Sequence, residues 1–262
     1  MQRVRMLAMR IKVLASGSKG NSTYVCCGDM RFLIDIGINY KTLCNALESE
    51  GITPKDLYGV LITHIHTDHI KGLASLVKKT NMRVFVPELI ANDLRKVVPS
   101  DNLMIISDTF HLADVCVQLI HTSHDVPCSV GYVISYGSSS LVYITDTGYV
   151  NRKYFDLLKN RTIYILESNH DEKMVMDGPY PYILKQRVLS DDGHLSNRTA
   201  STYLQNWIGP DTRYIVLAHL SEINNTPEVA MDTLNDTFQV FPNELLDVKI
   251  AKQHEPLETI EV

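Results

Sequence analysis

Five apolar segments of this sequence end at a side chain that can bind a metal ion. Their composition, rich in Val, Ile, Leu and Tyr, and their short length are typical of β-strands. They end in "LITH" (His64), "HTSH" (His124), "VYITD" (Asp146), "ILES" (Glu167) and "VLAHL" (His219). Strands that each carry such a residue at their C-terminal end would converge on one edge of a sheet. The sequence therefore predicts a polar site built on the ends of β-strands.

The remaining pattern predicts a mixed α/β chain. Strands are expected at 11–17, 22–27, 31–37, 59–64, 82–87, 115–124, 131–137, 140–146, 162–168 and 214–220. Helices are expected at 40–50, 69–80, 87–98, 178–190, 197–207 and 226–241, with Asn197 as the cap of the fifth. Early strands form hairpins, with a Gly28–Asp29 turn, and later ones alternate with helices. This mixture favours two sheets with helices outside them, in one domain over 1–262.

Composition narrows the class of protein. Of the 262 residues, 45% are hydrophobic and 21% are charged, which is ordinary for a globular chain and excludes disordered and collagen-like classes. The formal net charge of −5 argues against a wholly basic surface for nucleic acid. A local basic groove, or metal ions that supply positive charge themselves, would still be compatible with it.

The cysteines and the amino-terminal segment predict the compartment. Arg10 and Lys12 interrupt the apolar start, so no signal-peptide core forms, and no apolar run reaches the roughly 18 residues of a membrane span. We therefore expect a cytoplasmic protein without a membrane partner. The five cysteines are an odd number without a Cys-x-x-Cys pair and are expected to be small buried side chains. They are Cys26, Cys27, Cys44, Cys116 and Cys128.

The stretch "THIHTDH" (63–69) concentrates metal-capable side chains. His64 and His66 lie two apart at a strand end, so both can reach one ion, whereas Asp68 and His69 follow in a turn and face elsewhere. One tetrahedral ion cannot take all four, but two ions could share them if other segments supplied more ligands. Placed to do so are His124, Asp146 and His219. Taken singly, these histidines could equally be ordinary core or surface residues.

The same stretch resembles the T-H-x-H-x-D-H signature of the metallo-β-lactamase superfamily. Further motifs follow in order, namely "LIDIG" with Asp35, "SHD" with His124, "ITDTG" with Asp146 and "LAHL" with His219. The resemblance implies an αββα sandwich with a dinuclear metal site. It implies one ion on His64, His66 and His124, a second on Asp68, His69 and His219, Asp146 as their bridge, and Asp35 as a brace.

Longer segments are similar to the YycJ/WalJ group of this superfamily. They are "LASGSKGNSTYV", "ILESNHD", "GPYPYILKQRVLS", "GHLSN" and "LAHLSEINNTP". This similarity implies a metal-dependent nuclease with 5′-to-3′ exonuclease activity on DNA. One departure follows "SHD", where the group usually has an acidic residue and a proline before V-G-Y, and this chain has Cys128–Ser129. We expect this change to reshape the loop beside His124 without removing the ligand.

A dinuclear site alone does not choose a substrate. Two ions about 3.5–4 Å apart can hold a hydroxide and polarise an oxygen of a lactam, a thioester or a phosphodiester. The carboxylate of Asp146 argues against lactams, since the best-known lactam-hydrolysing branch has a cysteine there. Phosphodiester cleavage also favours a proton donor, for which His194 is a candidate, oriented by Glu167. This pair is similar to one in the tRNA 3′-processing members, although His194 could instead simply cap the next helix.

Several polar residues are candidates for binding substrate phosphate. Ser18 and Asn21 lie in a Gly/Ser loop, and Ser196 and Asn197 lie at a helix N-terminus. Lys185 and Arg187 could meet a nucleic-acid backbone. Such a loop is more often only a turn, and such a basic pair more often only a solvated face.

The primary hypothesis is a phosphodiesterase that uses two divalent ions (Zn, Mn or Fe) and acts on DNA from a 5′ end. A hydroxide oriented by Asp68 would attack phosphorus, and RNA remains an alternative substrate. The 72 residues between Asp146 and His219 leave no room for an inserted domain, so the single domain, or a homo-oligomer, would hold the substrate. The rivals are a small-molecule hydrolase, for a thioester, lactam or cyclic phosphodiester, and a non-enzymatic regulator that uses metal only for stability.

Overall fold

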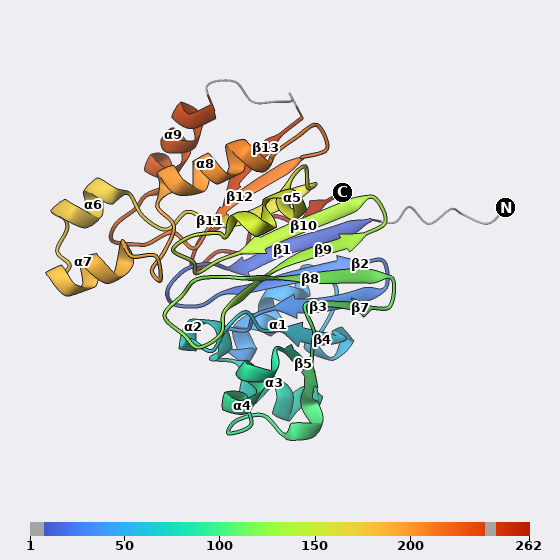
Figure 1. The fold of residues 1–262 in the computed structure, drawn as a ribbon. Coiled ribbons are helices and arrows are strands. Elements are labelled where there is room, and N and C mark those ends of the chain that lie inside the picture. The colour runs from blue at the N-terminus through green and yellow to red at the C-terminus, as the bar shows by residue number, and fades with distance from the viewer. Residues whose placement is uncertain (1–7, 239–244) are drawn as a thin grey trace.

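The computed structural model describes residues 8–238 and 245–262, in which two β-sheets pack face to face with helices on both outer sides (Figure 1). The first sheet contains β1 (Met9–Ala15), β2 (Ser22–Cys27), β3 (Met30–Ile34), β4 (Gly59–Leu61), β5 (Arg83–Val86), β6 (Leu103–Ile105) and β14 (Ile260–Glu261). The second contains β7 (Thr109–Leu112), β8 (Val115–His121), β9 (Val130–Tyr136), β10 (Ser139–Ile144), β11 (Ile163–Glu167), β12 (Tyr214–Ala218) and β13 (Asp247–Ile250). This arrangement confirms the predicted αββα sandwich.

The helices cover the two outer faces. Against the first sheet lie α1 (Tyr40–Glu48), α3 (Leu73–Thr80) and α4 (Glu88–Leu94), and against the second lie α5 (Phe155–Leu158), α8 (Asn197–Trp207) and α9 (Pro227–Phe238). The short α2 (Thr67–Ile70) follows β4, and α6 (Glu172–Asp177) and α7 (Tyr182–Val188) extend away from the sheets in Figure 1. Three 3-10 turns lie at Pro54–Asp56, Ser100–Asn102 and Arg152–Tyr154.

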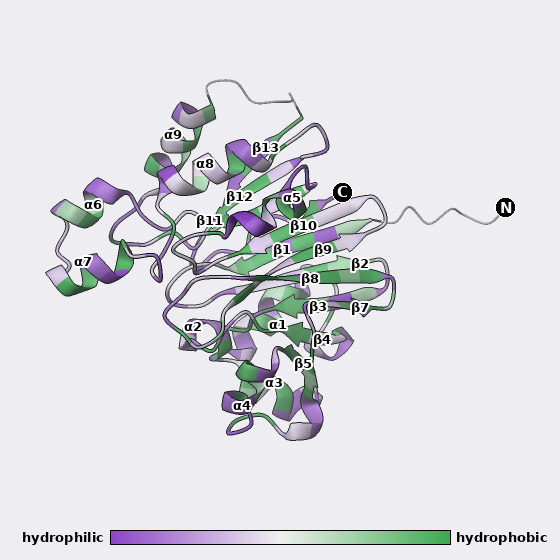
Figure 2. Ribbon diagram, in the orientation of Figure 1, coloured by the Kyte–Doolittle hydropathy of each residue, from purple (hydrophilic) through white to green (hydrophobic). Residues whose placement is uncertain are grey.

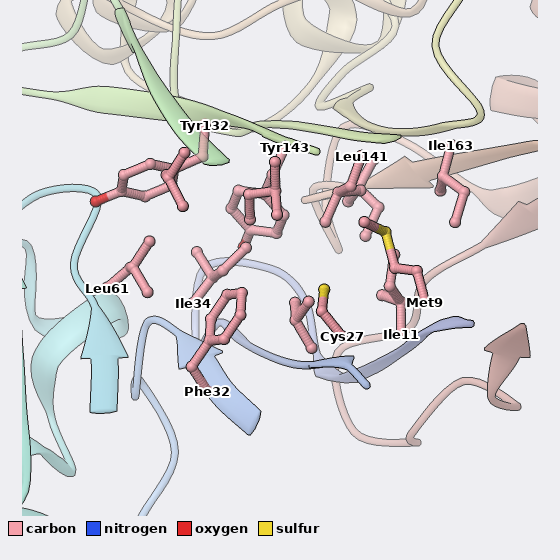
Figure 3. Packing of buried hydrophobic residues seen from close by; sticks show 14 of the residues in the cluster. Met9, Ile11, Cys27, Phe32, Ile34, Leu61, Tyr132, Leu141, Tyr143 and Ile163 are labelled. Carbon is pink, nitrogen blue, oxygen red and sulfur yellow. The ribbon is translucent and has the colours of Figure 1, made fainter. Parts of the chain in front are cut away.

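Both faces of the central strands are buried. In β10, Leu141 and Tyr143 point into the core between the sheets, whereas Val142 and Ile144 pack under the outer helices. Figure 3 shows Tyr143 above Ile34 and Leu141 nearer Met9 and Cys27, all three of the first sheet. Figure 2 shows that hydrophobic residues predominate in the central strands, while α6, α7 and α9 are mixed. Strands buried on two faces read as continuous apolar runs, which is why their positions were predictable.

Strand order explains how the ends converge. The strands run β14-β1-β2-β3-β4-β5-β6 in one sheet and β13-β12-β11-β10-β9-β8-β7 in the other. The pairs β3–β4, β10–β11 and β11–β12 are parallel, and β8 has the direction of β10 because both are antiparallel to β9. The carboxyl ends of these strands therefore meet at one edge, as predicted.

Some element predictions were wrong. The helix expected at 69–80 is divided into α2 and α3 at Gly72, where an added Cβ would lie 2.1 Å from the Ile38 carbonyl oxygen. The segment 178–190 is helical only in α7, after Pro181, and α6 precedes it. Ser196, not Asn197, caps α8 by accepting from the backbone N–H of Thr199. The end of the helix expected at 226–241 lies outside the described residues, as do residues 1–7.

The described residues contain no helix long and apolar enough to cross a membrane. No disulfide joins the five cysteines. Cys26 and Cys27 are buried, as expected, while the other three are half-buried.

Candidate metal centre

The predicted site residues lie together, mostly in loops just after strands. His64 follows β4, His124 follows β8, Asp146 follows β10 and His219 follows β12, while Glu167 is the last residue of β11. The strands at 59–64 and 115–124 thus end earlier than predicted, and loops carry their histidines. Because those loops start from one edge of the paired sheets, side chains from both sheets share one site.

Three imidazoles form the first potential metal group: His64, His66 and His124. His66 Nδ1 lies 3.1 Å from His64 Nε2 and 3.2 Å from His124 Nε2. His124 Nδ1 lies 3.1 Å from the carbonyl oxygen of Gly193, which can only accept, so that nitrogen carries the proton. The Nε2 lone pair of His124 therefore faces the other two rings, as a metal ligand requires.

A second potential group contains Asp68, His69, Asp146 and His219. Asp146 Oδ2 lies 3.1 Å from His69 Nε2, and Asp146 Oδ1 lies 3.4 Å from His219 Nε2 and 3.9 Å from His124 Nε2. Asp68 Oδ2 lies 3.5 Å from His69 Nε2 and 3.7 Å from His219 Nε2. Asp146 is thus the carboxylate that reaches both groups.

Buried carboxylates orient the imidazoles from behind. Asp35 Oδ2 lies 2.7 Å from His69 Nδ1, and the Asp35 carboxylate also accepts from the N–H and the hydroxyl of Thr63, each at 2.8 Å. Glu167 Oε1 lies 3.0 Å from His219 Nδ1. Both carboxylates are fully buried, and each leaves the Nε2 of its histidine directed at the centre.

The buried polar atoms fit divalent metal ions. Among the described residues, Asp146 Oδ2 and His219 Nε2 are buried without a well-directed hydrogen bond, although both have ionisable neighbours, and this is costly unless a cation meets them. Burial lowers the pKa of His69, but Asp146 and Asp35 outweigh it and raise that pKa to about 10. Metal binding should therefore expel a proton from His69. Imidazole and carboxylate donors suit zinc, manganese and iron alike.

Three residues of the centre have left-handed backbones. The φ angles are 58° at Asp35, 53° at Asp146 and 56° at His219. Such a conformation costs a residue other than glycine roughly 1–3 kcal/mol, and it collects where the fold over-determines a functional geometry. No pattern in the sequence signals this strain, although Asp and His tolerate it better than most residues.

A Glu–His pair lies at the edge of the second group. His194 Nδ1 lies 2.7 Å from Glu167 Oε1 and 3.9 Å from Asp146 Oδ1, and the His194 side chain is 20% exposed. Glu167 Oε2 accepts from the backbone N–H groups of Thr147 and Leu195. Burial raises the pKa of Glu167, but His194 and the hydrogen bonds outweigh it and hold that pKa at about 2. Glu167 is therefore a fixed anion shared by His194 and His219.

Residues 30–219 match a family described as the beta-lactamase superfamily domain. The chain belongs to that superfamily. Exodeoxyribonuclease YycJ of Bacillus anthracis is 34% identical over 89% of this chain and 90% of its own length, and exodeoxyribonuclease WalJ of Streptococcus pneumoniae is 34% identical over 87% of each chain. The predicted resemblance to the YycJ/WalJ group is thus confirmed.

Solved structures of the superfamily share the fold. The metallo-beta-lactamase fold protein YhfI of Bacillus subtilis superposes with a TM-score of 0.72 over 95% of this chain and 99% of its own, at 16% identity. Human tRNase Z, short form, superposes with a TM-score of 0.63 over 95% and 98%, at 15% identity. At these identities the superpositions support the αββα architecture and nothing finer.

Two of the six residues predicted to bind substrate phosphate lie beside the candidate metal centre. Ser18 and Arg187 line a cavity of about 160 Å³ together with His124, His194 and His219. Arg187 Nε donates to Asp125 Oδ2 at 2.6 Å, which holds the guanidinium near the site.

The geometry does not favour the other four as phosphate contacts. Asn21 is buried, and its side chain bonds Gly17 and lies 2.9 Å from His69 Nε2, so it ties the Gly/Ser loop to the centre. Ser196 caps α8 and donates to Glu172, and Asn197 is buried against Asn225. Lys185 donates to the carbonyl of Met176. Their polar atoms are already used inside the fold, which sequence alone cannot reveal.

Hydrogen bonds join the two ends of the loop that contains Cys128 and Ser129, where the sequence departs from the YycJ/WalJ pattern. Thr122 Oγ1 donates to Ser129 Oγ at 2.8 Å, and the N–H of Thr122 donates to the Ser129 carbonyl at 3.0 Å. Cys128 packs against the apolar core. Ser129 therefore anchors the loop that carries His124, and His124 lies in the first potential metal group.

Gly37 should be essential for the shape of the centre. A Cβ there would lie 1.6 Å from the Asp68 carbonyl oxygen and 2.6 Å from the Asn21 nitrogen, so the loop after β3 could not pack against α2. We expect Gly37→Ala to lower the free energy of unfolding by roughly 3 kcal/mol, measured by denaturant titration. Gly51→Ala is the control, since nothing lies within 4 Å of it and only left-handed strain, about 1 kcal/mol, should act. Equal losses in the two variants would contradict this steric role.

Proposed function

We propose that this chain is a dinuclear-metal phosphodiesterase that degrades DNA from its 5′ end. The observation that carries the proposal is the position of Asp146 between two metal-capable groups, with His194, held by Glu167, at their edge. The names of the YycJ and WalJ relatives support DNA as the substrate. Residues 1–262 would act as one domain, in the cytoplasm, and the fitting metals are zinc, manganese and iron.

Different residues are proposed to assist the attack of water on phosphorus and the departure of the leaving oxygen. The ions would polarise a phosphoryl oxygen and make a water molecule acidic enough to attack. Asp68, whose side chain is 22% exposed, accepts a hydrogen bond from the attacking water and orients it. Arg187 lines the same cavity; Asp125 engages its Nε and Nη2, and the remaining N–H groups of the guanidinium would meet a phosphate oxygen.

His194 is the proposed proton donor. A phosphodiester expels an alkoxide, a poor leaving group, so a positioned acid should accelerate the step by about a hundredfold or more. Glu167 occupies Nδ1 of His194 and leaves Nε2 to deliver the proton. Burial lowers the pKa of His194, but Glu167 and Asp146 outweigh it and raise that pKa, so the ring holds its proton to a higher pH than a free imidazole does.

An assay on defined substrates tests the proposal. Metal-stripped protein is reloaded with zinc, manganese or iron and given 5′-labelled DNA or RNA of one sequence. We expect labelled mononucleotides to appear first from DNA with at least one metal. Hydrolysis of a thioester or a cyclic phosphodiester without DNA cleavage would favour the small-molecule alternative. No turnover with any metal, together with a lower Tm after chelation, would favour a purely structural site.

A further inference from the structure

A second cavity lies beside His194. Its volume is about 480 Å³, and His194 lines both this cavity and the smaller one at the metal centre. Its walls come from the loop after β10, from α6, from the loop after α7 and from α8. The residues that matter here are Tyr149, Glu172, Met176, Leu189, Asp191 and Tyr203. Tyr149 lies three residues beyond Asp146, so this wall continues directly from the centre.

Apolar side chains in this cavity are unusually accessible. Tyr149 is 41% exposed, Met176 is 59% exposed and Leu189 is 40% exposed. Large apolar side chains that gather in one hollow generally mark a place where a ligand binds. The Tyr149 loop is firmly held, because Thr147 Oγ1 donates to the Tyr149 carbonyl at 2.7 Å and Gly148 packs closely against Asp191.

The charges of the two cavities differ. Glu172 and Asp191 line the larger cavity, and no lysine or arginine is among its lining residues in the described chain, whereas Arg187 and Asp192 both line the smaller one. Phosphate is therefore disfavoured in the larger cavity and favoured beside the metals. A flat, neutral group that can stack on an aromatic ring suits the larger cavity.

We propose that the larger cavity binds the nucleoside of the departing 5′ nucleotide, with its base against Tyr149. This inference rests on the proposed nuclease function. Water forms a new bond to phosphorus and loses its proton to solvent, while the bond from phosphorus to the 3′ oxygen breaks and that oxygen takes the proton of His194. The nucleoside that owns this oxygen must lie next to His194, and the cavity lies there.

The test removes the ring and the base separately and together. The substrates are 5′-phosphorylated, 3′-fluorescein-labelled single strands that carry thymidine or an abasic residue at the first position, or an abasic residue in the middle. The proteins are wild type, Tyr149→Ala, Tyr149→Phe and Tyr182→Ala, the last being an exposed tyrosine on α7 outside both cavities. Kd is measured by anisotropy on the chelated protein and kcat/KM on the metal-loaded one.

We expect the terminal abasic residue to weaken wild-type binding by roughly tenfold, the scale of one base–aromatic stack. Tyr149→Ala should lose the same factor on the thymidine strand and nothing further on the abasic strand. Tyr149→Phe, Tyr182→Ala and the strand with the central abasic residue should behave like wild type. The subsite would be overturned if the losses in affinity from Tyr149→Ala and from the terminal abasic residue multiplied when combined. It would also be overturned if the wild type bound the thymidine strand and the terminally abasic strand equally well. Base-dependent binding without cleavage under any metal would support the subsite and overturn the nuclease proposal.

Discussion

Replacing Asp146 by alanine should empty both metal groups and abolish hydrolysis. Its two oxygens lie 3.1 Å from His69 Nε2, 3.4 Å from His219 Nε2 and 3.9 Å from His124 Nε2, so one carboxylate joins ligands of both groups. In the proposed dinuclear centre, each divalent ion would contribute several kcal/mol to stabilising the transition state. We therefore expect kcat/KM to fall by about a thousandfold or more. Elemental analysis of the purified variant should find less than one ion per chain.

The control for this variant is Asp114→Ala, an exposed aspartate in the turn between β7 and β8, at the opposite end of β8 from His124. It should keep the metal content and the turnover of the wild type. If Asp146→Ala bound as much metal as this control, the bridging role would be wrong, and the two groups would be independent sites.

The candidate ligands could be predicted because most of them follow strand ends, whereas their division between two ions came from the family resemblance. His64, His124, Asp146 and His219 each follow a buried apolar strand, and the sandwich brings these strand ends to one edge. The close spacing of His66, Asp68 and His69 along the chain identified the remaining candidate ligands. Such long-range convergence can be read from sequence because both faces of each strand are buried, which makes the strands easy to recognise.

Roles that depend on hydrogen bonds between distant segments could not be predicted. Glu167 was expected to orient His194, but its Oε1 also bonds His219, fifty-two residues away in sequence. Asn21 and Ser196 have the composition of an anion site, yet the fold uses their polar atoms for Gly17 and for the start of α8. A polar residue type limits its partners without choosing among them.

The four strands that were missed are the outermost strands of the two sheets. The strands β6, β7, β13 and β14 have two to four residues each, and Leu112 and Ile260 are their only buried residues. Such segments are too short to show an alternation of apolar and polar residues. They form strands because they hydrogen-bond to the exposed edge of a neighbouring strand. The long central strands, which determine where the site lies, were found.

Replacing His194 by alanine should leave both metals in place and slow DNA cleavage by about a hundredfold or more. His194 bonds Glu167 through Nδ1 and belongs to neither of the two groups that the sequence assigned to metals, so its loss should spare the metal content. Burial lowers the pKa of His194, but Glu167 and Asp146 outweigh it and raise that pKa. His194 should therefore lose its proton, and stop acting as an acid, only above the usual imidazole pKa of about 6.5. The alkaline limb of the wild-type rate profile should therefore disappear in the variant.

A change of leaving group separates proton donation from a structural role. Thymidine 5′-p-nitrophenyl phosphate releases a phenolate that needs little protonation, so His194→Ala should hydrolyse it at nearly the wild-type rate. Glu167→Gln is the matched comparison: because Glu167 also orients His219, that variant should lose metal affinity by about 10- to 100-fold and slow both substrates. If His194→Ala slowed the nitrophenyl ester as much as DNA, His194 would be positioning the centre or binding an ion with Asp146, Glu167 and His219, a third group whose ligand atoms also lie within 4.8 Å of one another.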